Sequence, residues 1–191
     1  RDEFRKRYEL FAADLHAEFR LCEPNFRITL NEMPAVDHVI DEKTQFGLVY
    51  SLVGVPNGVV AMSMALPGLV ETSTNLASVK FVDGAKIVVT SSQRSSVESA
   101  KTYVMQMVES VFALAGADVA HSDGYPGWAP DPSSRLLEVS VASYRRLFGR
   151  EPKVRAIHAG LECGLFLEKY PELEMVSFGP TLRGVHSPDE R

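Results

Sequence analysis

The stretch from residue 71 to residue 90 reads ETSTNLASVKFVDGAKIVVT and carries the clearest structural signal in the chain. Every second residue from Ala77 to Phe81 is apolar, which is the period of a strand with one buried face, and residues 86–90 repeat that period. Asp83-Gly84 between the two segments is a strong signal for a two-residue hairpin turn, because both residues tolerate the positive φ that this turn requires. The stretch therefore predicts an antiparallel β-hairpin.

A helix is predicted directly after the hairpin. Ser95 and Glu98 have the spacing of a capping box, in which each side chain satisfies a backbone N–H group of the other residue. Gly116 is expected to end the helix. Its apolar positions recur at helical spacing: Val97, Ala100, Val104, Met107, Val108, Val111, Leu114 and Ala115.

The elements before the hairpin complete a small domain. A strand is predicted over residues 59–64, after a turn at Pro56-Asn57-Gly58, and a helix over 37–53 with Asp37 as its cap. An amphipathic helix from Phe4 to Phe19 ends before Pro24, and a short strand is expected over 26–30. This order predicts an α+β architecture, an antiparallel sheet with helices on one face.

The character of the sequence changes near residue 120. Residues 125–132 are rich in Pro and Gly, and a helix is predicted from about Ser133 to Gly149. A strand over 154–158, a helix over 161–169 and a strand over 175–178 then have the order of a βαβ unit with a parallel strand pair. We therefore expect an α/β segment at residues 121–191, separate from a first domain at residues 1–120.

Composition excludes several classes of protein. The 191 residues carry 20 Lys and Arg against 25 Asp and Glu, a net charge of −5, and 45% are hydrophobic. A mildly acidic chain gives no electrostatic reason to expect nucleic-acid binding. No apolar run approaches the roughly 20 residues that span a bilayer, so no membrane role is expected. The only two cysteines, Cys22 and Cys163, are expected to be reduced and mostly buried, which favours a cytoplasmic setting.

No complete catalytic motif is present. The five histidines have no close-spaced zinc pattern such as HExxH, and there is no Walker loop, GxGxxG or GxSxG. The chain begins with Arg1 and resembles a piece of something longer. Judged by spacing alone, no site is complete within it.

Two positions stand out because each follows a predicted buried strand. His186 lies in the polar stretch 179–190, at the end of a strand where α/β sheets gather ligands, although an ordinary surface histidine has the same pattern. Glu162 lies among small residues that let a ligand approach the backbone, and it is suited to bind a substrate ammonium group. The alternative is a glutamate favoured by the helix dipole, and His158 nearby has the alternative of a satisfied core histidine.

Arg94 comes at the end of the second hairpin strand, directly before the predicted helix. A guanidinium beside free helix N-terminal amides makes a good carboxylate site. An exposed pair with Glu98 is the alternative, worth a few tenths of a kcal/mol. The sequence alone leaves both interpretations open.

The same segments resemble the aminoacyl-histidine dipeptidases, the peptidase D family of the carnosinase-like two-zinc peptidases. The resemblance runs from about Val55 to Arg191, and residues 1–54 match only in helical character. The matching text is PNGV at 56–59, VETS at 70–73 with Asn75, GYPGW at 124–128, IHAGLECGLF at 157–166, GP at 179–180, and HSPDE at 186–190 after Gly184.

The resemblance implies a zinc-peptidase catalytic domain interrupted by a lid domain. Residues 1–120 would be the later part of the lid, which forms homodimers in this family, and residues 121–191 the last segment of the catalytic domain. His186 would be a zinc ligand, and Glu162 with His158 would lie in the substrate loop. Arg94 would hold the carboxylate of the dipeptide, and Asn75 would match a substrate-binding asparagine of the lid.

The implied reaction is hydrolysis of Xaa-His and other dipeptides by a hydroxide that bridges two zinc ions. The general base and the other zinc ligands would lie outside this sequence, so no catalytic residue is expected in it. A catalytic zinc needs about three protein ligands, and only His186 is present. We therefore expect the isolated chain to be inactive. The alternative is a non-catalytic binding or dimerisation module.

Overall fold

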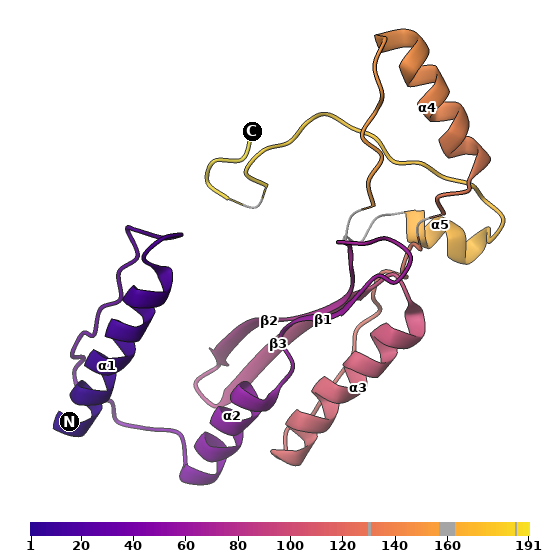
Figure 1. Ribbon diagram of the computed structural model, residues 1–191. Coiled ribbons are helices and arrows are strands. Elements are labelled where there is room, and N and C mark those ends of the chain that lie inside the picture. The colour runs from indigo at the N-terminus through magenta and orange to yellow at the C-terminus, as the bar shows by residue number, and fades with distance from the viewer. Residues whose placement is uncertain (130, 157–162, 186) are drawn as a thin grey trace. The chain divides into compact units, whose positions relative to one another are not determined.

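The computed structural model describes residues 1–129, 131–156, 163–185 and 187–191. It forms two compact units, residues 1–40 and residues 41–191 (Figure 1). The expected division near residue 120 lies within the second unit and stays a prediction. Among the described residues, no helix combines the length and apolarity needed to cross a bilayer.

The first unit consists of helix α1 (Asp2–Phe19) and the segment that follows it. The hydroxyl of Tyr8 donates to the Ile28 carbonyl at 2.9 Å, and the rings of Phe19 and Phe26 lie 5.5 Å apart, so this segment folds back against the helix. The strand expected over 26–30 is wrong, because strand structure needs a hydrogen-bonded neighbouring strand and this segment has none among the described residues. Cys22 is exposed, which corrects its expected burial.

The second unit begins with a three-stranded antiparallel sheet in the order β1 (Gly58–Met62), β2 (Val70–Val82) and β3 (Lys86–Ser95). The predicted hairpin forms, but Val82 pairs with Lys86, so its loop has three residues, 83–85, rather than the expected two. Asp83 and Gly84 in this loop have φ values of 51° and 68°. Two positive φ values in succession are those of the type I′ turn, whose twist matches that of the flanking strands.

A β-bulge interrupts β2 at Ala77, where Leu76 pairs with Ser91 but Ser78 pairs with Thr90. The bulge places Leu76, rather than Ala77, against the hydrophobic core. The expectation that Ala77 to Phe81 alternate into the core is therefore wrong. Phe81 is 64% exposed near the hairpin tip, beyond the reach of the packed core.

Helix α3 (Glu98–Leu114) packs on the sheet, and helix α2 (Glu42–Gly54) packs on α3. The core consists of buried Val55, Val108 and Phe112, with partly buried Leu76, Val89 and Val111 around them. This confirms the predicted antiparallel sheet with helices on one face.

The predicted caps of these two helices are wrong. Asp41, rather than Asp37, caps α2 by accepting a hydrogen bond from the Thr44 N–H group. Ser95 is the last residue of β3, and α3 starts after Val97 without a side-chain cap. The ladder with β2 holds Ser95 in the strand and prevents the predicted capping box. Gly116 follows α3 with a φ of 79°, as expected of a residue that ends a helix.

Residues 117–191 contain helix α4 (Arg135–Phe148) and helix α5 (Cys163–Lys169). Ser134 caps α4, and Gly149 ends it with a left-handed φ of 65°. No strand forms in the described residues of this part, so the expected strand over 175–178 is wrong. Of the strand expected over 154–158, residues 154–156 are irregular. A strand needs a neighbouring strand to bond, and the described residues of this part offer none. The rest of the expected 154–158 strand lies outside the described residues.

Candidate functional site

Arg94 and Asn75 lie on the same face of the sheet. Arg94 on β3 is paired with Ser73 on β2, and Asn75 on β2 is paired with Ser92 on β3. The pair between them, Thr74 and Gln93, points to the opposite face. Arg94 and Asn75 are therefore diagonal neighbours across two strands, a separation that a long side chain spans. Both are exposed.

The face of the sheet under these two residues carries a hydrogen-bonded polar layer. Thr72 and Thr74 are only 1% and 2% exposed. The Thr72 and Ser95 hydroxyls lie 2.8 Å apart, and the Gln93 amide donates to the Thr74 hydroxyl at 3.2 Å. Buried polar groups of this kind fix strand register because any slip leaves them unpaired. The layer thus fixes where Arg94 stands relative to Asn75.

The sequence interpretation missed this polar layer, although a signal for it exists. Thr72 and Thr74 on one strand, and Gln93 and Ser95 on the next, are polar residues at period-two positions that face the helix. When polar residues occupy the core-facing positions of two neighbouring strands, they indicate side chains that hydrogen-bond to one another. They do not show that the buried face of the strands was assigned wrongly. Asn57 adds a further contact by accepting a hydrogen bond from the Leu76 N–H group at 2.8 Å, next to the bulge.

The alternative pairing of Arg94 is not formed. Glu98 pairs with Lys101 at 2.8 Å, while Arg94 sits in a strand, where the helical i,i+4 geometry does not apply. Among the described residues no ion pair of Arg94 is found. The guanidinium is therefore open to a ligand, three residues before the N-cap of α3 rather than beside its first turn.

The other predicted site residues, His158, Glu162 and His186, lie outside the described residues. The chain on either side of position 186 forms a closed turn, because Arg183 and Arg191 exchange two backbone hydrogen bonds of 2.8 and 3.0 Å. Within it the Ser187 hydroxyl donates to the Gly184 carbonyl at 2.6 Å, and Gly184 has a φ of 62°. The described residues on either side of position 186 are thus held together by backbone hydrogen bonds.

A metal site is not complete in the described part of the chain. No group of three or more His, Cys, Asp or Glu side chains converges there. Since a catalytic zinc takes about three protein ligands, the described residues alone do not fit one.

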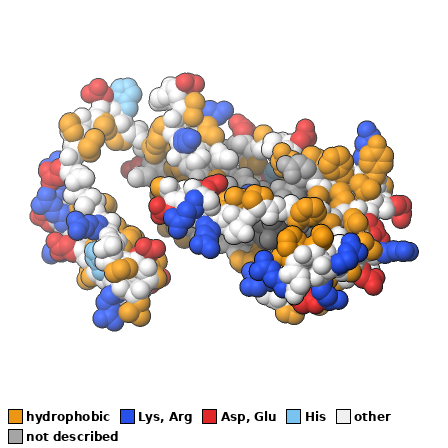
Figure 2. Space-filling view, turned by 90° about the horizontal axis from the view of Figure 1, so that it is seen from above, with side chains coloured by type: hydrophobic (Ala, Val, Ile, Leu, Met, Phe, Trp, Pro, Cys, Tyr) orange, Lys and Arg blue, Asp and Glu red, His pale blue; other side chains and the backbone are white. Residues whose placement is uncertain are grey.

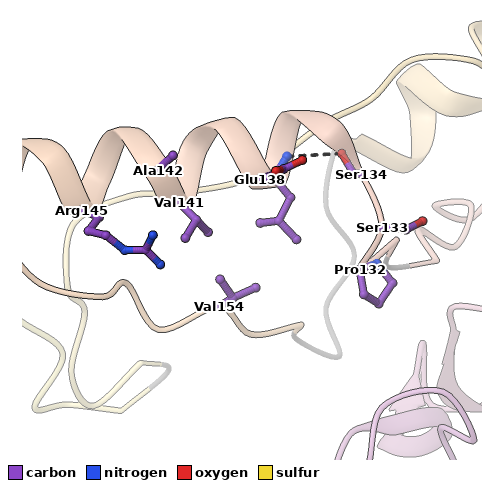
Figure 3. A pocket seen from close by; sticks show the side chains of 9 residues that line it. Pro132, Ser133, Ser134, Glu138, Val141, Ala142, Arg145 and Val154 are labelled. Carbon is purple, nitrogen blue, oxygen red and sulfur yellow. Dashed lines mark hydrogen bonds between the residues drawn. The ribbon is translucent and has the colours of Figure 1, made fainter.

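A hollow with a volume of about 500 Å³ lies under α4 (Figure 3). Val141 and Val154 face each other across it, and Arg145 borders it. The Arg145 guanidinium donates to Glu151, which holds the pKa of that carboxyl below its ordinary value. None of the predicted site residues in the described part lines this hollow, and we do not assign it a function.

Basic and acidic side chains lie interspersed on the face shown in Figure 2, and many hydrophobic side chains are open to solvent. Phe46 and Tyr50 on α2, whose rings lie 4.1 Å apart, are each 63% exposed. The expectation that nucleic acid is not a partner stays a prediction.

Comparison with known proteins gives one class, the dipeptidases. No protein-family model matches the chain. It is 40% identical over 169 residues, 88% of its length, to the cytosol non-specific dipeptidase of Escherichia coli (strain K12), of which it covers 35%. It also matches the crystal structure of the aminoacylhistidine dipeptidase from Vibrio alginolyticus, with a TM-score of 0.83 and 38% identity.

That structural match covers 99% of this chain and 38% of the Vibrio chain. The chain therefore spans somewhat more than a third of the length of each of these relatives. The predicted resemblance to the aminoacyl-histidine dipeptidases is confirmed in both sequence and fold.

Proposed function

We propose that this chain forms the substrate-carboxylate-binding part of a zinc-dependent dipeptidase that hydrolyses Xaa-His and other dipeptides. The observation that carries the proposal is the 40% identity to a dipeptidase over 88% of the chain. The placement of Arg94 and Asn75 on one open face of the sheet supports it.

Arg94 is suited to bind the terminal carboxylate of a dipeptide. Its planar guanidinium offers two parallel N–H groups to the two carboxylate oxygens, and such charge-assisted bonds are the strong ones. The Asn75 amide, on the neighbouring strand, has a donor for the same carboxylate or for the peptide group beside it. Glu162, with His158, is proposed to bind the ammonium end, which sets the length of substrate accepted.

The metal belongs to the proposal through His186. We propose zinc, with the His186 imidazole as one ligand and the remaining ligands on polypeptide beyond the described residues. Bound zinc would supply a hydroxide at neutral pH and polarise the scissile carbonyl. Because this chain alone lacks a sufficient ligand set, we propose that it is inactive in isolation.

We also propose a cytoplasmic location and a homodimer formed through the lid domain. The name of the Escherichia coli relative supports the location. The sheet order supports the dimer, because β3 is a 10-residue edge strand whose outer backbone groups face no other strand in the described sheet. The same edge favours the alternative, a non-catalytic assembly module.

A chimera tests the proposal directly. In it, this chain replaces the matched stretch of the Escherichia coli dipeptidase, and dipeptide hydrolysis is measured before and after removal of metal by a chelator. We expect metal-dependent hydrolysis in the chimera and none by the chain alone. Arg94→Ala should lower kcat/KM by about 10- to 100-fold, the cost of a hydrogen-bonded charge contact, mainly through KM.

Two control variants make this test specific. Arg94→Lys keeps the charge but loses the two-pronged geometry, so it should retain part of the binding. Lys80→Ala removes another exposed cation of the same sheet and should change little. A folded chimera without activity would favour the assembly module, and hydrolysis by the isolated chain would refute the proposed division of the site.

A further inference from the structure

Residues 124–128, GYPGW, form a segment that we call the connector, and it contacts the junction between β3 and α3. A Cβ atom added at Gly127 would lie 2.6 Å from the Ser95 carbonyl oxygen and 3.0 Å from the Ser96 Cα. Such distances are far inside van der Waals contact. The backbone of the connector therefore touches the backbone of the strand end that carries Arg94, and only glycine fits there.

The connector also touches helix α5. A Cβ atom added at Gly164, in the first turn of α5, would collide with the Pro126 carbonyl oxygen. Gly164 is buried by this contact. Two neighbouring connector residues thus make backbone contacts with two different elements. Gly127 contacts the end of β3, and Pro126 contacts α5.

The connector and the residues just before it are held along α3 by polar contacts. The Lys101 ammonium donates to the Tyr125 carbonyl at 3.0 Å and is only 11% exposed, and His121 lies 3.2 Å from Glu109. Residues 121–125 therefore run antiparallel to the helix, as the chain can be followed from α3 toward α4 in Figure 1. Contacts with β3, α3 and α5 leave the connector little freedom to shift.

We propose that Gly127 and Gly164 are positioning residues, which fix the β3 strand end that carries Arg94 at a set distance from α5. The inference rests on the proposed function, because α5 starts at Cys163, directly after the segment proposed to bind the substrate ammonium group. Backbone-to-backbone contacts suit this purpose, since they contain no flexible side chain that can absorb a displacement.

The first test uses the isolated chain and its single tryptophan, Trp128, which is the last residue of the connector. Gly127→Ala and Gly164→Ala should each separate the contacting backbones, raise acrylamide quenching of Trp128 and shift its emission to longer wavelength. Gly124→Ala is the matched control in the same segment, because nothing lies within 4 Å of a Cβ atom there. Circular dichroism reports whether each variant remains folded.

A second variant covers the case in which an added methyl group prevents folding. Lys101→Met removes the bond to Tyr125 while keeping the packing of the side chain, and it should increase quenching without inserting any atom into the contact. Quenching in all three variants equal to that of Gly124→Ala would overturn the proposed contact, whatever the chain's activity.

The second test measures the kinetic effect in the chimera described above. If the glycines position Arg94, Gly127→Ala and Gly164→Ala should raise KM for dipeptides several-fold with little change in kcat, while Gly124→Ala leaves both unchanged. Altered quenching with unchanged KM would overturn the positioning role. Loss of all activity in the parent chimera would instead count against the proposed function.

Discussion

The sheet with its two helices, residues 41–116, and the part that follows, residues 117–191, differ in how they are held together. Four described hydrophobic residues are buried, Val55, Val104, Val108 and Phe112, and all lie in the first part. In the second part, α4 has the strongest amphipathic pattern of the described helices but contains no buried residue. A periodic apolar stripe thus predicts a helix, whereas burial depends on a partner surface.

The second part is held mainly by polar contacts and backbone contacts. Glu174 bonds to the Leu136 N–H group and the Ser134 hydroxyl at the start of α4, and Arg145 bonds to Glu151 near its end. Such contacts give local order, but each adds little to stability when solvent competes. The comparison leads to the following predictions, from the largest expected effect to the smallest.

Truncating a phenylalanine in each part should give the largest contrast. Phe112→Ala removes a ring from the core and should lower the free energy of unfolding by about 3 kcal/mol, since a cavity replaces packed atoms. Phe148→Ala removes the same ring from a position that is 61% exposed, and about 0.5 kcal/mol or less is expected. Urea denaturation followed by circular dichroism measures both. Equal losses would contradict the comparison.

Glycines with positive φ allow a second comparison of stability between the two parts. Gly84→Ala at the hairpin and Gly149→Ala at the end of α4 should each cost about 1 kcal/mol, because both positions have positive φ. The hairpin variant should lower the midpoint of the whole cooperative transition. The α4 variant should reduce amide protection only in that helix. Gly179→Ala is the control, with open space and no positive φ.

Removing the carboxylate at the start of α4 should weaken that helix alone. Glu174→Gln replaces the charged acceptor of the 2.7 Å bond from the Leu136 N–H group, and a loss of about 1 kcal/mol is expected. Hydrogen exchange of the α4 amides measures this loss. Glu172→Gln is the exposed control, with no expected change. Reduced protection in α3 as well would show that the two parts are coupled.

Lowering the pH should weaken the Arg145–Glu151 contact near the end of α4, and this is the smallest of the expected effects. The hydrogen bond from Arg145 lowers the pKa of Glu151 below its ordinary value of 4.5. A lowered folded-state pKa gives a contribution that is present above the unfolded pKa and is lost as pH falls through the folded pKa. NMR titration should therefore show Glu151 with a midpoint below 4.5, and Arg145→Met should raise it. An unchanged Glu151 midpoint in the Arg145→Met variant would contradict the ion pair between these two residues.

Much of the first part was predictable from local sequence because its signals are local. The Asp83-Gly84 turn, the strands that flank it and the end of α3 follow from turn geometry and residue period. Predictions that need a partner failed: the strand expected at 175–178 has none among the described residues, and the ladder with β2 keeps Ser95 from capping α3.

For the candidate site, the sequence predicted roles for Arg94 and Asn75, but their placement relative to each other was not predictable from it. That placement depends on the register of β2 against β3, which the buried threonine layer fixes. It also depends on the bulge at Ala77, which no glycine or other turn-forming residue in the sequence predicts. The predicted roles of His158, Glu162 and His186 stay predictions, because those residues lie outside the described part.

The sequence by itself determined the resemblance to the dipeptidases, the hairpin, the helices and their approximate extents. These features depend on residue type and spacing over a few positions, which the chain carries in any environment. Only the tertiary structure decided which face Arg94 and Asn75 share, where the strands end, and which glycines bring backbones into contact. Those features arise from hydrogen bonds and packing between segments far apart in sequence, whose partners no local pattern specifies.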